Sequence, residues 1–119
     1  MDAFSQKEFA VVDWGMGNLH SIANALERIG CRAVITRREE DLRAADGIIL
    51  PGVGAFENAM RHLRQDGLIG VLHEEVIEKK KPFLGICLGM QVLGDASEEN
   101  GFHEGLGWIP GPVKKLDVR

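Results

Sequence analysis

Short runs of apolar residues alternate along the chain with longer segments in which apolar residues recur every three or four positions. Each run has the length of a buried strand, and each longer segment has the period of an amphipathic helix. The predicted strands are residues 9–13, 33–36, 47–50 and 83–86. The predicted helices are residues 19–29, 56–63, 68–76 and 88–93. Asn18 is placed to cap the first helix and Gly30 to end it.

This alternation of strands and helices predicts an α/β fold, with a parallel sheet, helices on both faces and right-handed crossovers. After Ser97 the chain is rich in glycine and proline, and residues 108–109 and 113–118 read as the beginnings of further strands. In a parallel sheet, chemistry gathers beyond the carboxyl ends of the strands. Two segments of unusual composition, residues 51–54 and 85–89, follow predicted strands in this way.

Composition narrows the class of protein. The chain has 119 residues, 45% of them hydrophobic, which is enough to build a core as one domain or part of one. A net charge of −4 argues against a nucleic-acid partner. Two cysteines are too few for a disulfide framework, and their spacing suggests no metal site. No apolar run spans a membrane and the N-terminus lacks a signal-peptide core, so we expect a cytoplasmic protein.

Residues 85–89 read Gly-Ile-Cys-Leu-Gly and place Cys87 in a tight strand-to-helix turn. This is the thiol counterpart of the nucleophile elbow, in which a side chain at either glycine would collide with neighbouring backbone and the nucleophile takes strained angles. The helix N-terminus favours the thiolate and supplies a backbone N–H for an oxyanion. Spacing alone is equally consistent with a small, buried, structural cysteine. Cys31 lacks such surroundings, and we expect it to be structural.

Residues 51–54 read Pro-Gly-Val-Gly. On composition alone this segment is a glycine-rich turn. Its functional interpretation is a flexible backbone strip whose N–H groups turn toward the oxyanion that attack on an amide generates. Because parallel strands bring their carboxyl ends to the same edge of a sheet, we expect Val53 and Gly54 to lie beside Cys87.

Three motifs together resemble a known family. Residues 85–91, Gly-Ile-Cys-Leu-Gly-Met-Gln, resemble the nucleophile motif of class I, or triad-type, glutamine amidotransferases. Residues 51–56, Pro-Gly-Val-Gly-Ala-Phe, and residues 13–19, Asp-x-Gly-Met-Gly-Asn-Leu, are similar to motifs of the glutaminase subunits of imidazole glycerol phosphate synthases. The resemblance covers nearly the whole chain from residue 9. It implies a three-layer, flavodoxin-like α/β fold, a heterodimer, and no cofactor or metal.

The resemblance also implies a role for each motif. Cys87 would attack the side-chain amide of glutamine and form a glutamyl thioester. The released ammonia would pass to a (β/α)₈-barrel cyclase subunit of histidine biosynthesis, which uses it on a phosphoribosyl-formimino intermediate. The implied oxyanion hole comprises Gly52, Val53 and Leu88, the implied substrate contacts are Gln91 and Glu99, and the implied partner interface includes Gly15, Met16, Gly17 and Asn18.

The sequence departs from the family at the catalytic base. The family completes its triad with a histidine and a glutamate in a later His-Pro-Glu-type segment, which this sequence lacks. Of His20, His62, His73 and His103, only His103 follows the cysteine motif, and its setting, Gly-Phe-His-Glu-Gly, differs from the family's. We therefore expect an N-terminal part of a single amidotransferase domain, truncated after residue 119, that is poorly stable and inactive alone.

Other interpretations stay open. Gly15-x-Gly17 after a strand resembles a dinucleotide-binding fingerprint, but His20 replaces the third glycine and no acid ends the second strand. A non-catalytic half-domain kept for binding the cyclase would account for the missing base. Another class I amidotransferase is a further alternative. Related cysteine-elbow hydrolases and chaperones share the turn, although residues 88–91 favour an amidotransferase.

Overall fold

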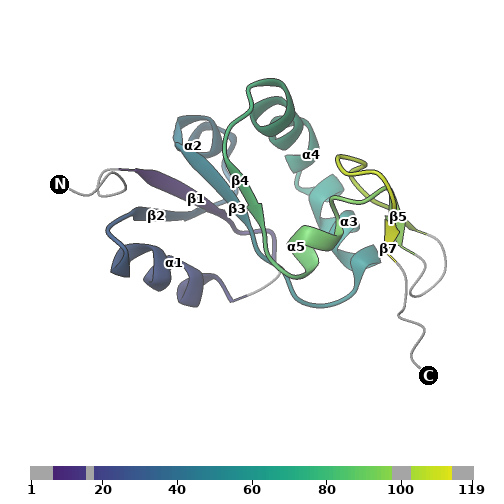
Figure 1. Ribbon diagram of the computed structural model, residues 1–119, viewed down its shortest axis with the longest axis horizontal. Coiled ribbons are helices and arrows are strands. Elements are labelled where there is room, and N and C mark those ends of the chain that lie inside the picture. Colours follow the sequence, from purple (N-terminus) through teal and green to yellow (C-terminus); the bar gives the residue numbers. More distant parts are fainter. Residues whose placement is uncertain (1–6, 16–17, 98–102, 114–119) are drawn as a thin grey trace.

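The computed structural model describes residues 7–15, 18–97 and 103–113, and four parallel strands form the main sheet of this part of the chain (Figure 1). The strands are β1 (Glu8–Val12), β2 (Arg32–Thr36), β3 (Gly47–Leu50) and β4 (Phe83–Gly85). They lie in the order β2-β1-β3-β4. The register pairs Phe9 with both Ala33 and Gly47, and Ile49 with Leu84. All four predicted strands are confirmed.

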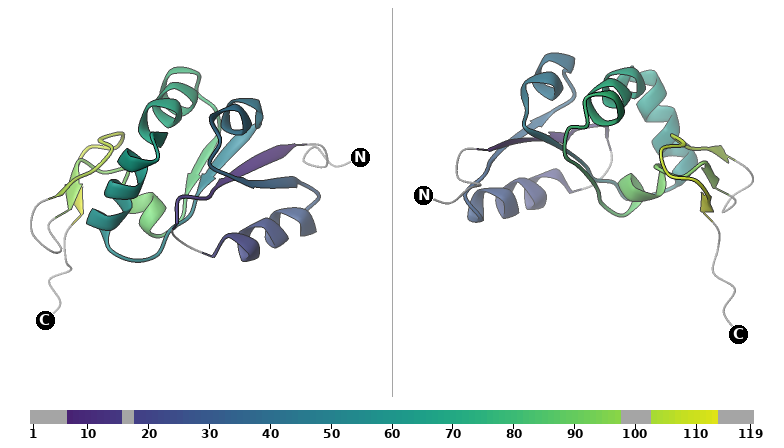
Figure 2. Two further views of the ribbon diagram at one scale, coloured as in Figure 1. Left: turned by 180° about the vertical axis from the view of Figure 1, so that it is seen from behind. Right: turned by 45° about the horizontal axis from the view of Figure 1, so that its top comes forward.

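Helices cover the two faces of this sheet unequally (Figures 1 and 2). One face carries α1 (Leu19–Arg28), which packs over β1 and β2. The other face carries α2 (Glu39–Ala44), α3 (Phe56–Gln65), α4 (Leu68–Leu72) and the π-helical segment η1 (His73–Glu78). The three layers of the predicted α/β fold are therefore confirmed. In the described residues, no helix combines the length and the apolar character that crossing a bilayer requires.

Alternate residues of the central strands face opposite layers, as a pleated strand dictates. Ala10 and Val12 of β1, with Ile48 and Leu50 of β3, join one buried cluster with side chains of α2, α3 and α4. The intervening residues, such as Val11, are buried as well. Burial on both faces explains why β1 and β3 read in the sequence as continuous apolar runs instead of alternating ones.

The ends of α1 follow the local rules used to predict them. The Asn18 side chain accepts a hydrogen bond from the Ser21 N–H at 3.3 Å and so caps the helix. Gly30 follows the last turn with φ of 90° and donates its N–H to the Glu27 carbonyl at 3.1 Å. A positive φ at this point favours glycine because it has no Cβ.

Two helical segments differ from the prediction. The sequence of α2, Glu-Glu-Asp-Leu-Arg-Ala, contains a single large apolar residue, Leu42, and therefore has no helical period that could predict it. The predicted helix over residues 68–76 is α-helical only to Leu72 and continues as η1. In η1 the residue Glu75 is only 1% exposed, although its side chain carries a charge.

The buried carboxylate of Glu75 is surrounded by cations, which together with it form what we call the Glu75 cluster. Lys81 Nζ lies 2.9 Å from Oε1, while Lys79 Nζ and Arg43 Nη1 lie 2.8 Å and 3.1 Å from Oε2. The hydrogen bond from Lys79, aided by Lys81 and opposed by burial, lowers the pKa of Glu75 to about 2. Lys81 also donates to the Leu42 carbonyl at 2.8 Å, so the cluster ties α2 to the segment that enters β4.

The last part of the described chain forms a second small sheet. Strands β5 (Ala96–Ser97), β6 (His103–Glu104) and β7 (Pro112–Val113) lie in the order β6-β5-β7. The strand expected at residues 108–109 is wrong, because these residues form a bend, where Trp108 packs edge-on against Phe83 with ring centroids 5.3 Å apart. Of the strand expected over residues 113–118, only Val113 is described, in β7.

Candidate active site

Cys87 stands at the turn between β4 and α5 (Leu88–Gln91), beyond the carboxyl end of the strand. Its backbone has φ of 52° and ψ of −116°, a conformation that strains any residue with a Cβ. Its side chain is exposed, whereas Cys31 is buried at 5% exposure. The strained elbow predicted from the sequence is therefore present, and Cys87 is the more exposed of the two thiols.

The two glycines around Cys87 permit this turn because backbone passes close to both. A Cβ at Gly85 would lie 2.7 Å from the carbonyl oxygen of Gly89. A Cβ at Gly89 would overlap the carbonyl oxygen of Leu50 at the end of β3. Both contacts are with main-chain atoms, which cannot move aside as a flexible side chain can. The predicted collision at either glycine is thus confirmed.

The helix after Cys87 is shorter than the predicted 88–93 segment. The hydrogen bonds change to a tighter pattern at its end, where Leu93 N–H donates to Met90 O and Gly94 N–H to Gln91 O, both at 3.2 Å. A single turn has a weaker macrodipole than a long helix. The contribution expected from the helix N-terminus is correspondingly smaller than the sequence suggested.

Residues 51–54, which we call the glycine strip, run from the end of β3 past the elbow. Pro51 and Gly52 are buried, while Val53 is 63% exposed. The Gly52 carbonyl accepts a hydrogen bond from the Leu88 N–H at 3.1 Å, and a Cβ on Gly52 would lie 3.1 Å from the Leu88 Cβ. The structure thus brings together Gly52 and Leu88, two of the residues that the sequence assigned to an oxyanion hole.

Trp14 is a residue of this site that sequence reasoning did not single out. Its side chain is fully buried, and its indole Nε1–H donates to the Pro51 carbonyl at 2.6 Å. A Cβ on Gly52 would lie 2.9 Å from Trp14 Cζ2, so the ring also lies against the next residue of the strip. The signal in the sequence was a large aromatic residue directly after a buried strand and before Gly15.

The other predicted site residues stand at the same edge of the sheet or outside the described residues. Gln91 is the last residue of α5 and lines a cavity of about 420 Å³ beside the small sheet. Gly15 is exposed, with φ of 83°, and a Cβ there would lie 3.4 Å from the His62 ring. Asn18 caps α1. The remaining three, Met16, Gly17 and Glu99, lie outside the described residues.

The sequence matches the family model for class I glutamine amidotransferases over residues 10–115. The chain belongs to the class I glutamine amidotransferase family. The matched residues include the elbow, the glycine strip and Trp14, so the site described above lies within the part of the chain that matches the family. The resemblance read from the three motifs is therefore confirmed.

Two curated relatives of this amidotransferase chain are HisH subunits. It is 54% identical over 108 residues to the imidazole glycerol phosphate synthase subunit HisH of a Cyanothece species, covering 91% of this chain and 50% of that protein. It is 52% identical over 110 residues to subunit HisH 2 of Vibrio vulnificus, covering 92% and 51%. The chain thus spans about half the length of the curated relatives it matches.

A solved structure supports the fold of this amidotransferase chain. The crystal structure of a glutamine amidotransferase superimposes with a TM-score of 0.72 at 22% identity, covering 89% of this chain and 56% of the other. At that identity the likeness speaks for the fold alone. The three-layer parallel architecture is the feature that the two chains share.

Three of the four histidines of this amidotransferase chain lie in helical segments of the described residues. His20 lies in α1 and His73 opens η1, and both are exposed. His62 lies in α3, where its Nδ1 is 2.7 Å from the Asn58 carbonyl oxygen and therefore carries the proton. His103 lies in β6, and its side chain is not among the parts that the structure describes.

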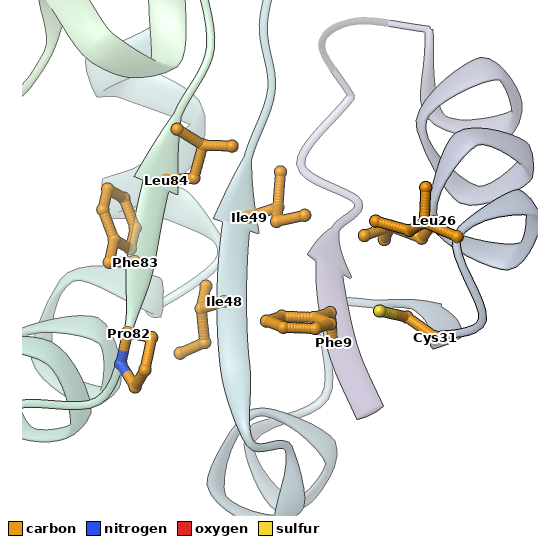
Figure 3. Close-up of a pocket in the computed structure, with 9 residues that line it drawn as sticks. Phe9, Leu26, Cys31, Ile48, Ile49, Pro82, Phe83 and Leu84 are labelled. Carbon is orange, nitrogen blue, oxygen red and sulfur yellow. The ribbon is translucent and has the colours of Figure 1, made fainter. Parts of the chain in front are cut away.

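A separate apolar groove of about 250 Å³ opens on the α1 face of the sheet (Figure 3). Figure 3 shows Leu26 and Cys31 on one side of it, Phe83 and Leu84 of β4 on the other, and Phe9 between them. The lining offers no charged group and none of the residues predicted for the site. Leu84 is 55% exposed, so α1 leaves β4 uncovered on this face. The groove therefore does not belong to the candidate active site.

Proposed function

We propose that this chain is the N-terminal, nucleophile-bearing part of a single glutamine amidotransferase domain, and that this domain is the glutaminase subunit of an imidazole glycerol phosphate synthase. The observation that carries the proposal is the exposed thiol of Cys87 on a strained elbow, with the Gly52 backbone 3.1 Å from the Leu88 N–H beside it. The relatives at 54% and 52% identity, both named HisH, support the choice of subunit.

The proposed chemistry begins with the Cys87 thiolate, which attacks the side-chain amide carbon of glutamine. The C–S bond forms as the carbonyl oxygen takes up negative charge, and the tetrahedral intermediate then expels ammonia. The glutamyl thioester that remains is hydrolysed by water to glutamate and the free thiol. One group must act first as general acid, giving a proton to the leaving nitrogen, and then as general base, taking one from water, and in this proposal that group lies outside residues 1–119.

The proposed oxyanion hole needs one rearrangement. Leu88 N–H is a suitable donor, but the Gly52 carbonyl occupies it in this structure. A rotation of the Gly52–Val53 peptide would turn that carbonyl away and bring the Val53 N–H toward the elbow. Glycine at position 52 favours such a rotation because it lacks a Cβ. Two backbone donors would then point at the developing oxyanion.

The substrate and partner assignments complete the proposal. Gln91 and Glu99 would contact glutamine, and Gly15, Met16, Gly17 and Asn18 would lie against a (β/α)₈-barrel cyclase subunit. In support, Gly15 and Asn18 follow β1 at the sheet edge where the glycine strip follows β3. Ammonia would pass to the cyclase and be used there on a phosphoribosyl-formimino intermediate.

Labelling of the two cysteines tests the nucleophile. The chain is treated with an L-glutamine analogue that carries a chloroketone in place of the amide, and the labelled peptides are quantified by mass spectrometry. We expect modification at Cys87 and protection of the buried Cys31, with the L form reacting faster than the D form. Predominant labelling at Cys31, or equal rates for the two enantiomers, would contradict the proposal.

Ammonia release tests the proposed division of the site. We expect residues 1–119 with excess cyclase subunit and its nucleotide substrate to turn over glutamine several orders of magnitude more slowly than a longer relative that carries the His-Pro-Glu segment. Comparable turnover would mean that a residue of this chain serves as base, and His103 would be replaced first. Cyclase binding without turnover, together with an unreactive Cys87, would favour the non-catalytic half-domain instead.

A further inference from the structure

Three consecutive carbonyl groups at the end of β3 are each held by a different element. The Leu50 carbonyl accepts from the Ile86 N–H at 3.0 Å, which continues the ladder between β3 and β4. The Gly52 carbonyl accepts from the Leu88 N–H at 3.1 Å. Between them, the Pro51 carbonyl accepts from the Trp14 indole at 2.6 Å. Alternate carbonyls of an extended chain point to opposite sides, so Pro51 faces β1 while its neighbours face the elbow.

The β1 backbone next to this point is already engaged elsewhere. The Asp13 N–H donates to the Thr36 carbonyl at 2.8 Å, on the β2 side. The Trp14 side chain therefore supplies the hydrogen-bond donor on the β3 side. Its acceptor, Pro51, lies two residues beyond Ile49, which forms the last backbone pair of the two strands with Val11. Because Pro51 is buried and the indole is fully buried, the loss of this N–H would leave a carbonyl without a partner in an apolar surrounding.

We propose that Trp14 is a positioning residue for the glutaminase reaction, because its indole pins the Pro51 carbonyl and thereby confines backbone rotation in the glycine strip to the Gly52–Val53 peptide. This inference rests on the proposed function. With Pro51 fixed, the Leu50 to Gly52 backbone keeps its place against the elbow. The Gly52–Val53 peptide, which must turn to free the Leu88 N–H, is then the first peptide after the Pro51 carbonyl that the indole holds.

The same contact links the candidate partner interface to the elbow. Trp14 directly precedes Gly15, whose position the resemblance assigns to the cyclase interface. A displacement of this turn would move the indole, and the indole holds the strip that lies against Leu88. Trp14 is thus a direct physical connection between the end of β1 and the backbone that must rotate.

The test compares Trp14→Phe, which keeps an aromatic ring and removes the N–H, with Trp108→Phe as a control. Trp108 packs edge-on against Phe83, so its replacement removes an indole N–H at another place in the fold. Amide hydrogen exchange is measured at Ile86 and Leu88. In Trp14→Phe we expect exchange at Leu88 to rise about tenfold, the factor that corresponds to one buried hydrogen bond, with Ile86 unchanged. In Trp108→Phe the two amides should keep their wild-type ratio.

Alkylation of Cys87 supplies the second measurement. The L-glutamine chloroketone places a carbonyl oxygen at the oxyanion position, whereas iodoacetamide requires no oxyanion hole. We expect Trp14→Phe to slow the first reaction about tenfold relative to the second, and Trp14→Tyr, which retains a donor, to restore part of the loss. An unchanged ratio of the two rates in Trp14→Phe would overturn the inference.

The two proposals fail in different ways. Equal acceleration of exchange at Ile86 and Leu88 would show that Trp14 only stabilises the fold, and the positioning role would fall. A wild-type chain that does not distinguish the L from the D chloroketone would overturn the glutaminase function. In that case the exchange ratio still decides whether Trp14 pins the strip.

Discussion

The backbone of Cys87 carries a conformation that most residues avoid. With φ of 52° and ψ of −116°, a residue with a Cβ is strained by about 1–3 kcal/mol. The surrounding hydrogen bonds keep it there, since Gly89 N–H donates to Ile86 O and Met90 N–H to Cys87 O at 3.0 Å and 2.9 Å. The exposed thiol therefore sits on a backbone that would relax if the side chain were removed.

Replacement of Cys87 by glycine should release this strain. We expect Cys87→Gly to have a free energy of unfolding about 1 kcal/mol greater than Cys87→Ala. Chemical denaturation of the two variants measures the difference. The same pair of substitutions at Cys31, which has no positive φ, should show the opposite order, because glycine there only adds freedom to the unfolded chain. A Cys87→Gly variant that is less stable than Cys87→Ala would contradict the assigned strain.

Residue-scale prediction from the sequence succeeded where the signal was local. The glycines of the elbow lie two positions from Cys87, so the strained turn could be read directly. The role of Trp14 could not, because its acceptor, Pro51, lies 37 positions away and the contact depends on how β1 and β3 align. Nothing in the sequence around Trp14 indicates that its indole donates to a carbonyl so far along the chain.

At the scale of elements, β3 and the elbow approach each other more closely than side chains allow. A Cβ on Gly89 would overlap the Leu50 carbonyl oxygen, which is main chain and part of the ladder to Ile86. By contrast, Gly70 in α4 has nothing within 4 Å of a Cβ position. Close packing therefore requires glycine at position 89, whereas position 70 has room for a larger side chain.

Alanine at these two positions should act in opposite directions. We expect Gly89→Ala to destabilise the chain by about 3 kcal/mol or more, because β3 and α5 must separate. Gly70→Ala should stabilise it by up to about 1 kcal/mol, because alanine favours a helix. Thermal and denaturant unfolding of both variants provide the comparison. A tolerated Gly89→Ala would mean that the elbow does not pack against β3 as described.

The Glu75 cluster joins α2, η1 and the entry to β4 through one buried carboxylate. The pKa of Glu75 is lowered from its ordinary 4.5 to about 2. A carboxyl whose pKa is lower in the folded than in the unfolded state stabilises the fold above the unfolded pKa. That stability is lost as protons bind while the pH falls.

The acid limb of the stability profile should therefore carry the signature of Glu75. We expect the free energy of unfolding to fall between about pH 4.5 and 2, and this part of the fall to shrink in Glu75→Gln. The exposed Glu78 at the end of η1 gives a matched control, since Glu78→Gln should leave the acid limb close to wild type. An unchanged pH profile in Glu75→Gln would show that the cluster does not control acid stability.

α2, a helix that the sequence did not predict, was missed for a physical reason. α2 is held by hydrogen bonds and ion pairs instead of an apolar stripe: Thr36 Oγ1 accepts from the Arg38 N–H at 3.0 Å, and Arg43 Nη2 lies 2.6 Å from Glu39 Oε1. Such polar interactions leave no hydrophobic period. β1 and β3, which are buried on both faces, instead read as continuous apolar runs, and those runs predicted them as strands.

On the scale of the whole molecule, the two faces of the sheet are covered to different degrees. The face toward α2, α3 and α4 holds the buried cluster, which includes Leu63 at 0% exposure. On the opposite face the groove of Figure 3 leaves Leu84 at 55% exposure. Most of the stabilisation that comes from buried apolar side chains is therefore expected on one side of the sheet.

Truncation of leucine on each face measures this asymmetry. We expect Leu63→Ala to destabilise the chain by about 2–5 kcal/mol through the cavity it leaves. Leu84→Ala should change the free energy of unfolding by less than about 0.5 kcal/mol, as an exposed site allows. Similar losses in the two variants would show that Leu84 is covered in solution.

The strand order β2-β1-β3-β4 has a consequence for how the protein is made. During synthesis the N-terminal residues leave the ribosome first. In this order β2 can pair with β1 first, β3 can then add at the open side of β1, and β4 at the open side of β3, so no strand must be inserted between two that are already paired. Cys87 follows all four of these strands in the chain. We therefore expect its costly backbone conformation to be imposed on a sheet whose parallel strands have already been synthesised.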